Sequence, residues 1–212
     1  MPFDFFTLAN HLQTAITQAE AELRLEQAVY GLDTRDEKQL QELLAAGLAS
    51  NYEVAREVHY PSSAGKKLTH RQRCDLALTE KGWPLKRDSE LPTLFDPPNL
   101  SPPHLALWLE VKIAYQFREG GDRHGGYGGQ WRDAVVEDLR KMESDPLIRE
   151  AGLALLVFNE SEPILAKDIE LFETILMQKE VLAGFRQVRT IPILDRIGHK
   201  LCTIALWPTI QR

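Results

Sequence analysis

The stretch LALWLEVKIAY, residues 105–115, decides the fold of this chain. Large apolar residues occupy every second position, which is the period of a β-strand. One side of the strand would be apolar throughout: Leu105, Leu107, Leu109, Val111, Ile113 and Tyr115. The other side carries Ala106, Trp108, Glu110, Lys112 and Ala114. Glu110 and Lys112 differ by two positions, so their side chains leave the same side, about 6–7 Å apart along the strand.

Two further strands are predicted upstream. Residues 52–60 place Tyr52, Val54, Arg56, Val58 and Tyr60 in alternation with more polar neighbours, and Pro61 closes the pattern. Residues 73–79 form a shorter strand with Cys74, Leu76 and Leu78 on one side, so Asp75 points to the other. On a strand beside residues 105–115, Asp75 would join Glu110 and Lys112.

The rest of the chain is predicted to form four helices and two further strands. An amphipathic helix fits residues 4–30 and ends at Gly31, and a second fits 35–49, capped by Thr34, with Leu40, Leu43, Leu44 and Leu48 buried. Downstream, the pattern predicts a helix over 130–144, a buried strand over 152–159, a helix over 164–178 and a strand over 201–207. We expect one α/β domain over residues 1–212, with an N-terminal helical extension (1–34), a core (35–160) and a C-terminal helix and strand (161–212).

Composition narrows the class of protein. With 212 residues, 43% of them hydrophobic, the chain can bury one core. It contains no apolar run of about 18 residues and no basic, apolar leader at its start, which predicts no membrane partner and a cytoplasmic location. Cys74 and Cys202 lie in apolar stretches typical of buried thiols. The net charge of -6 argues against non-specific coating of nucleic acid, but it permits a basic cleft.

Asp75, Glu110 and Lys112 together predict a metal site. Two carboxylates at a strand pair offer hard oxygen ligands suited to Mg²⁺ or Mn²⁺, completed by waters, substrate phosphate and a backbone carbonyl such as that of Val111. The metal would polarise a scissile phosphate. Lys112 would stabilise the attacking hydroxide or the developing negative charge.

The segments Cys74-Asp75-Leu76 and Leu109-Glu110-Val111-Lys112 resemble the motif pair of the PD-(D/E)XK nuclease superfamily, with Cys74 in place of the proline. The resemblance covers roughly residues 35–159. It implies a restriction-endonuclease-like αβββαβ core, a mixed central sheet flanked by helices, and metal-dependent hydrolysis of DNA. It also implies a further acidic residue from the preceding helix, for which we choose Glu37, with Glu57 as the rival. The helix after the Glu-X-Lys strand would add polar contacts from Gln130, Asp138 or Lys141.

Contacts to nucleic acid are predicted from charge. Lys66, Lys67, Arg71 and Arg73 form a basic stretch before Asp75. Arg123 lies within the glycine-rich segment 120–129, which we expect to be a mobile flap that closes over nucleic acid. A solvated surface loop is the alternative for each segment. The glycines match neither a P-loop nor a dinucleotide fingerprint, and the six histidines show no zinc spacing.

Two other functions stay open. The chain would also fit a catalytically silent, nuclease-like binding or scaffolding subunit of a larger nucleic-acid-processing assembly, or a homodimer. In the second alternative, Glu110 and Lys112 are a surface pair on an unrelated α/β domain. The presence of all three motif residues favours the enzyme, and Trp108 beside them favours a covered cleft.

Overall fold

The computed structural model describes residues 3–63, 72–86 and 98–209. Six strands form one mixed sheet in the order β1-β2-β3-β4-β6-β5. The strands are β1 (Tyr52–His59), β2 (Arg73–Glu80), β3 (Leu107–Tyr115), β4 (Glu150–Asn159), β5 (Gln187–Pro192) and β6 (Leu201–Pro208). β3 and β4 are parallel, and the other neighbours are antiparallel. The predicted α/β class with a mixed sheet flanked by helices is confirmed.

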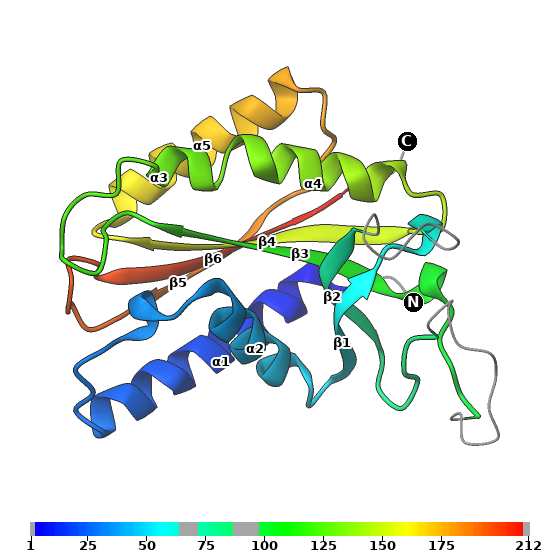
Figure 1. Cartoon of the computed structure of the whole chain (residues 1–212), viewed down its shortest axis with the longest axis horizontal. Helices are drawn as coiled ribbons and strands as arrows, with labels where there is room; N and C mark the ends of the chain where they lie inside the picture. The colour runs from blue at the N-terminus through cyan, green and yellow to red at the C-terminus, as the bar shows by residue number, and fades with distance from the viewer. Residues whose placement is uncertain (1–2, 64–71, 87–97, 210–212) are drawn as a thin grey trace.

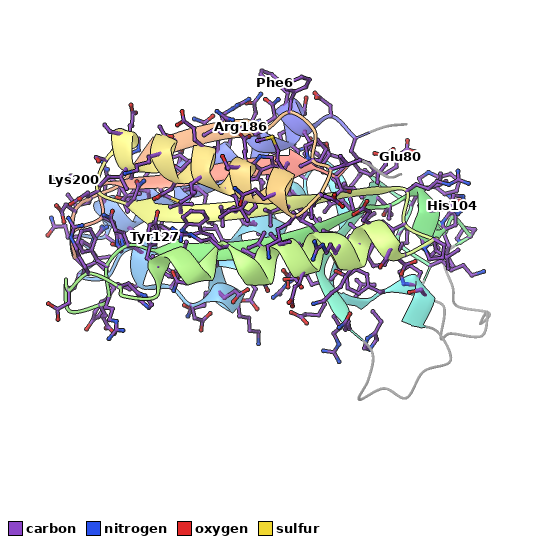
Figure 2. All side chains as sticks on the ribbon, turned by 90° about the horizontal axis from the view of Figure 1, so that it is seen from above. Phe6, Glu80, His104, Tyr127, Arg186 and Lys200 are labelled. Carbon is purple, nitrogen blue, oxygen red and sulfur yellow. The ribbon has the colours of Figure 1, made fainter. Side chains whose placement is uncertain are left out.

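Helices cover both faces of this sheet (Figure 1). On one face lie α1 (Phe5–Leu25) and α2 (Glu37–Leu48), and on the other α4 (Asp133–Ser144) and α5 (Glu162–Gln178), with the single turn α3 (Tyr127–Gln130) before α4. Seen from above, α4 and α5 lie over the sheet, with Tyr127 and Lys200 at one end and Glu80 and His104 at the other (Figure 2).

The two helical layers bury separate apolar clusters. Leu107, Leu109, Val111 and Ile113 of β3 pack in the cluster under α1 and α2, which we call the lower core. Trp108 packs in the cluster under α4 and α5, the upper core. β3 therefore has the two sides that its sequence predicts, although Leu105 lies outside the strand and is exposed. β4 contributes to both cores, as expected for a strand buried on both faces.

The β1–β2 pair changes faces halfway along, which the alternation did not predict. Tyr52 and Val54 pack against the lower core, whereas Val58 and Tyr60 belong to the upper core. The ladder pairs Arg56 with Leu76 and Val58 with Cys74, and skips the residues between them. Glu57, at the skipped position, has a φ of 51°, a left-handed conformation that interrupts the pleat. The prediction that Cys74 shares a side with Leu76 and Leu78 is wrong for the same reason, since Cys74 joins the upper core.

Helix ends depend on caps that the apolar period does not report. α1 ends at Leu25 rather than near Gly31, because Gln27 adopts a φ of 52° and the N–H groups of Gln27 and Ala28 bond to the carbonyls of Arg24 and Leu23. α2 is capped by Asp36, in a reciprocal pair of bonds with Gln39, and not by Thr34. β5 lies at the sheet edge and was not predicted. None of the described helices is long and apolar enough to cross a bilayer.

Candidate active site

The carboxylate of Asp75 sits between β2 and β3. The ladder joining these strands includes only Leu76–Leu78 and Leu107–Leu109. Immediately beyond it, the Asp75 Oδ2 accepts a hydrogen bond of 2.7 Å from the backbone N–H of Val111. The side chain thus takes the place that a backbone carbonyl of β2 would occupy in a continued ladder. This bond fixes Asp75 against the segment of β3 that carries Glu110 and Lys112.

Glu110 is buried, with an exposed fraction of 5%, but polar groups meet both of its oxygens. Lys112 Nζ donates to Oε1 over 3.3 Å, and the Tyr60 hydroxyl donates to Oε2 over 3.3 Å. The Tyr60 ring stacks on Trp108 at a centroid distance of 6.1 Å. Tyr60 reaches this side only because β1 changes faces at Glu57, so the regular alternation concealed it.

Lys112 lies between two carboxylates. Its Nζ is 3.3 Å from Glu110 Oε1 and 3.0 Å from Asp138 Oδ2 on α4. Lys141, one turn further along α4, contacts the other Asp138 oxygen at 2.6 Å. The chain of charges runs Glu110, Lys112, Asp138, Lys141, and it ties the helix to the strand below it.

Burial and charge shift the pKa values of these groups. Burial raises the pKa of Asp75, the Glu110 carboxylate raises it further, and the Val111 N–H opposes both. Burial also raises the pKa of Glu110, against the effect of Lys112. Burial lowers the pKa of Lys112, but Glu110 and Asp138 outweigh it and hold that pKa above its ordinary value. The pair of acids therefore resists double ionisation unless a further positive charge arrives.

The donor set suits a hard divalent cation. Asp75 and Glu110 supply carboxylate oxygens whose repulsion a cation would relieve. The N–H and C=O of one strand residue point toward the same neighbouring strand, so we expect the Val111 carbonyl to face the same gap as its N–H. Within the described ranges, no three His, Cys, Asp or Glu side chains gather as a metal-binding group, so the remaining ligands would be carbonyl, water and substrate oxygens. Burial and the two carboxylates raise the pKa of Cys74 well above its ordinary value, which keeps it a neutral thiol.

The two candidates for the additional acid differ. Glu37 is exposed in the first turn of α2, and after the larger effect of burial its charge still adds to the raised pKa of Asp75. Glu57 is exposed and pairs with Arg73 at 3.8 Å. Glu37 therefore acts on Asp75 through its charge, whereas Glu57 shapes the strand.

The structure describes four of the seven residues predicted to contact nucleic acid: Arg73, Arg123, Gln130 and Lys141. Lys66, Lys67 and Arg71 lie outside the described residues, and the exposed Arg73 is paired as above. Gln130 accepts a bond of 2.9 Å from the N–H of Tyr115 at the end of β3, and Lys141 supports Asp138. Both therefore brace the site from the side of α3 and α4.

Arg123 lies further away, in the glycine-rich segment beyond β3. It pairs with Glu160 at 3.2 Å. That segment forms a turn in which Arg118 N–H bonds to Asp122 and His124 N–H bonds to Gln116, followed by α3. Closure over a ligand stays a prediction.

Comparison of this chain with protein-family models, with curated proteins and with solved structures finds no match in any of the three.

Proposed function

We propose that this chain is a metal-dependent nuclease of the PD-(D/E)XK type that hydrolyses phosphodiester bonds in DNA. The observation that carries the proposal is the hydrogen bond from Val111 N–H to Asp75. It fixes an acid from one strand beside the Glu-Val-Lys triplet of the next, with Glu110 and Lys112 on the same face. A chance pair on a surface strand would have no reason to hold one carboxylate buried and another partly buried beside the point where the β2–β3 ladder stops.

The order of elements gives further support. From α2 onward the chain runs α2, β1, β2, β3, α4, β4, which is the αβββαβ order implied by the resemblance. The acid lies on the second strand and the triplet on the third. α4 then returns over the triplet, which brings Asp138 to Lys112.

Asp75, Glu110 and the Val111 carbonyl are the groups that would hold Mg²⁺ or Mn²⁺. The ion would supply polarisation of the phosphate and a water of lowered pKa. Asp75 is held for that task by the Val111 N–H, and Glu110 by the Tyr60 hydroxyl.

Lys112 would act on the reacting phosphate. Its Nζ is partly exposed and carries a proton throughout the neutral range, because the neighbouring carboxylates raise its pKa. Asp138 offers it a second acceptor, so Lys112 can loosen its contact with Glu110 and still remain in place. A fixed ammonium group at this point would stabilise negative charge that develops during hydrolysis.

A cleavage assay on plasmid and on single- and double-stranded oligonucleotides tests the proposal. We expect cutting with Mg²⁺ or Mn²⁺ and none in EDTA. Asp75→Asn and Lys112→Ala should each lower the rate by about 10² or more while the circular dichroism spectrum is retained. Matched exposed variants, Glu170→Gln and Lys167→Ala, should cut at the normal rate.

Three outcomes would overturn the proposal: cleavage that persists in EDTA, cleavage that survives Asp75→Asn, or no cleavage under any metal. In the last case, retained DNA binding would point to the scaffolding subunit instead.

A further inference from the structure

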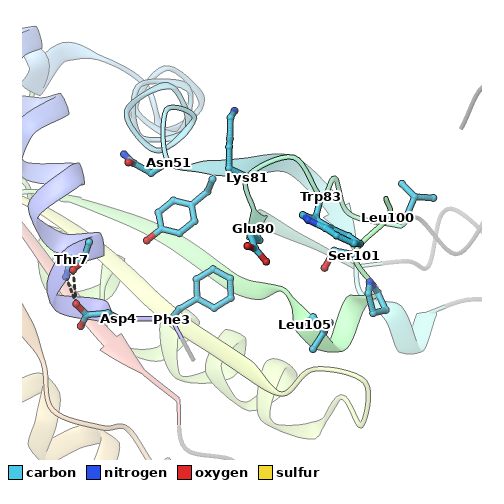
Figure 3. A pocket seen from close by; sticks show the side chains of 12 residues that line it. Phe3, Asp4, Thr7, Asn51, Glu80, Lys81, Trp83, Leu100, Ser101 and Leu105 are labelled. Atoms are coloured by element: carbon cyan, nitrogen blue, oxygen red, sulfur yellow. Dashed lines mark hydrogen bonds between the residues drawn. The ribbon is translucent and has the colours of Figure 1, made fainter. Parts of the chain in front are cut away.

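A separate pocket lies where the β1–β2 hairpin ends against the start of α1 (Figure 3). Its volume is about 590 Å³, which is within the range of small-molecule sites. Its apolar walls come from three aromatic and three other apolar residues: Phe3, Tyr52, Trp83, Leu100, Pro102 and Leu105. None of these belongs to the candidate active site.

The walls leave apolar surface in contact with water. Phe3 and Tyr52 form one side, with ring centroids 5.9 Å apart. Across from them, the exposed fractions of Trp83 and Leu105 are 43% and 55%. Large apolar side chains that stay half exposed around a concave surface are stabilised when an apolar ligand covers them.

Charge in the pocket is unbalanced. Glu80 is the ladder partner of Tyr52, and in Figure 3 its carboxylate lies between the rings of Phe3 and Trp83. No hydrogen bond or ion pair joins this carboxylate to another residue of the described part of the chain.

The other two charged residues of the lining are already engaged. Asp4 accepts the N–H groups of Phe6 and Thr7 as the cap of α1. Lys81 Nζ turns to the Ala49 carbonyl at 2.8 Å and to Glu53 at 3.3 Å. Among the described residues that line the pocket, Glu80 therefore remains as the charge available to a ligand.

We propose that this pocket binds a small organic amine, in which a protonated amine or guanidine is carried on an aromatic or aliphatic body. The body covers the rings of Phe3, Tyr52 and Trp83. The cationic group contacts the Glu80 carboxylate and the faces of those rings, which attract cations. Anionic ligands are repelled by Glu80, since Lys81 is directed away. The proposal is independent of the nuclease function and concerns different residues.

Trp83 gives a direct signal for the test. The chain has four tryptophans, and Trp108, Trp131 and Trp207 are at most 2% exposed. A ligand in the pocket should therefore quench the fluorescence of Trp83 selectively. The probes are phenethylamine, its neutral counterpart phenethyl alcohol and the anion hydrocinnamate.

We expect saturable quenching by phenethylamine, binding of the alcohol about tenfold weaker, and none by hydrocinnamate. Glu80→Gln should weaken phenethylamine about tenfold and leave the alcohol unchanged. The exposed control Glu170→Gln, which removes an equal charge outside the pocket, should change neither.

Equal affinity for the three probes, the absence of saturable quenching, or an unchanged amine affinity in Glu80→Gln would each overturn the proposal. If Glu80→Gln does not fold, Trp83→Ala replaces it, and calorimetry should then find the amine affinity lost. Retained affinity in Trp83→Ala would likewise reject the site.

Discussion

Two groups of buried charges in this molecule can be compared. The first, which we call the His199 cluster, comprises Glu20, Asp33, Arg196 and His199. His199 Nε2 accepts the N–H of Phe117 at 3.0 Å, so its Nδ1 carries the proton and donates to Asp33 Oδ2 at 2.9 Å. Glu20 accepts the N–H of Leu194 at 2.8 Å and lies 3.6 Å from Arg196. These contacts tie the α1–α2 region to segments more than 160 positions away.

The second group is the candidate active site. In the His199 cluster, Glu20 pairs with Arg196 and with the half-exposed Arg24 beside the cluster, and Asp33 pairs with His199, so two carboxylates lie near two arginines. In the candidate site, Asp75, Glu110 and Asp138 face Lys112 and Lys141, three against two. The paired charges of the His199 cluster hold chain segments together, whereas in the candidate site burial and then neighbouring carboxylates raise the pKa values of Asp75 and Glu110, which favours binding of a cation.

The largest effect on stability should come from breaking the His199 cluster. His199→Ala leaves the buried Asp33 and the Phe117 N–H without their partner, at a cost of about 3 kcal/mol. We expect urea unfolding to show this loss, with little change in the partly exposed control His104→Ala. The DNA cleavage rate per folded molecule should be retained. A loss below about 0.5 kcal/mol would contradict the structural role.

Removal of a carboxylate from the candidate site should raise the free energy of unfolding instead of lowering it. Asparagine at position 75 can still accept the Val111 N–H, but it carries no charge to be repelled by Glu110. We expect Asp75→Asn to raise the unfolding free energy of the metal-free protein by about 1 kcal/mol at pH 8. Asp33→Asn, the matched change in the His199 cluster, should lower it. In thermal melts, we expect Mn²⁺ to stabilise the unchanged protein and Asp33→Asn, but not Asp75→Asn. Destabilisation by both variants would erase the distinction.

The pH dependence should sharpen the comparison further. The pKa values of Asp75 and Glu110 are raised in the folded state, chiefly by burial, so that state binds more protons than the unfolded chain above about pH 4. Their contribution to stability is present at low pH and lost as pH rises through the raised values. We expect the melting temperature in EDTA to fall between pH 5 and pH 8, and saturating Mn²⁺ to reduce this fall. An identical slope in Asp75→Asn would assign the effect to other groups.

The smallest effect should come from Arg123, which is exposed and paired with Glu160. If the glycine-rich segment 120–129 meets DNA, Arg123→Ala should weaken binding about threefold and reduce the salt slope by about one. Shortening the segment to a tight turn should have a larger effect of the same kind. Fluorescence anisotropy over a salt series measures both. Unchanged affinity and slope would make the segment a passive loop.

Local patterns were sufficient for several features. The two-residue period of β3 predicted its lower-core side and the shared face of Glu110 and Lys112, because adjacent strand residues alternate whatever lies around them. The continuous apolar run that forms β4 predicted burial on both faces of that strand. The apolar stretches around Cys74 and Cys202 predicted that both cysteines are buried free thiols. These properties belong to single elements, so the sequence by itself determined them.

Contacts between elements were decided only by the tertiary structure. The left-handed conformation at Glu57 switches the two faces of β1 and brings Tyr60 to Glu110, and the residue type at position 57 does not predict it. The placement of Asp75 depends on where the β2–β3 ladder stops, and the meeting of Asp138 with Lys112 depends on how α4 crosses β3. A sequence period reports which side of one element is apolar, but the alignment of two elements follows from packing across the whole sheet.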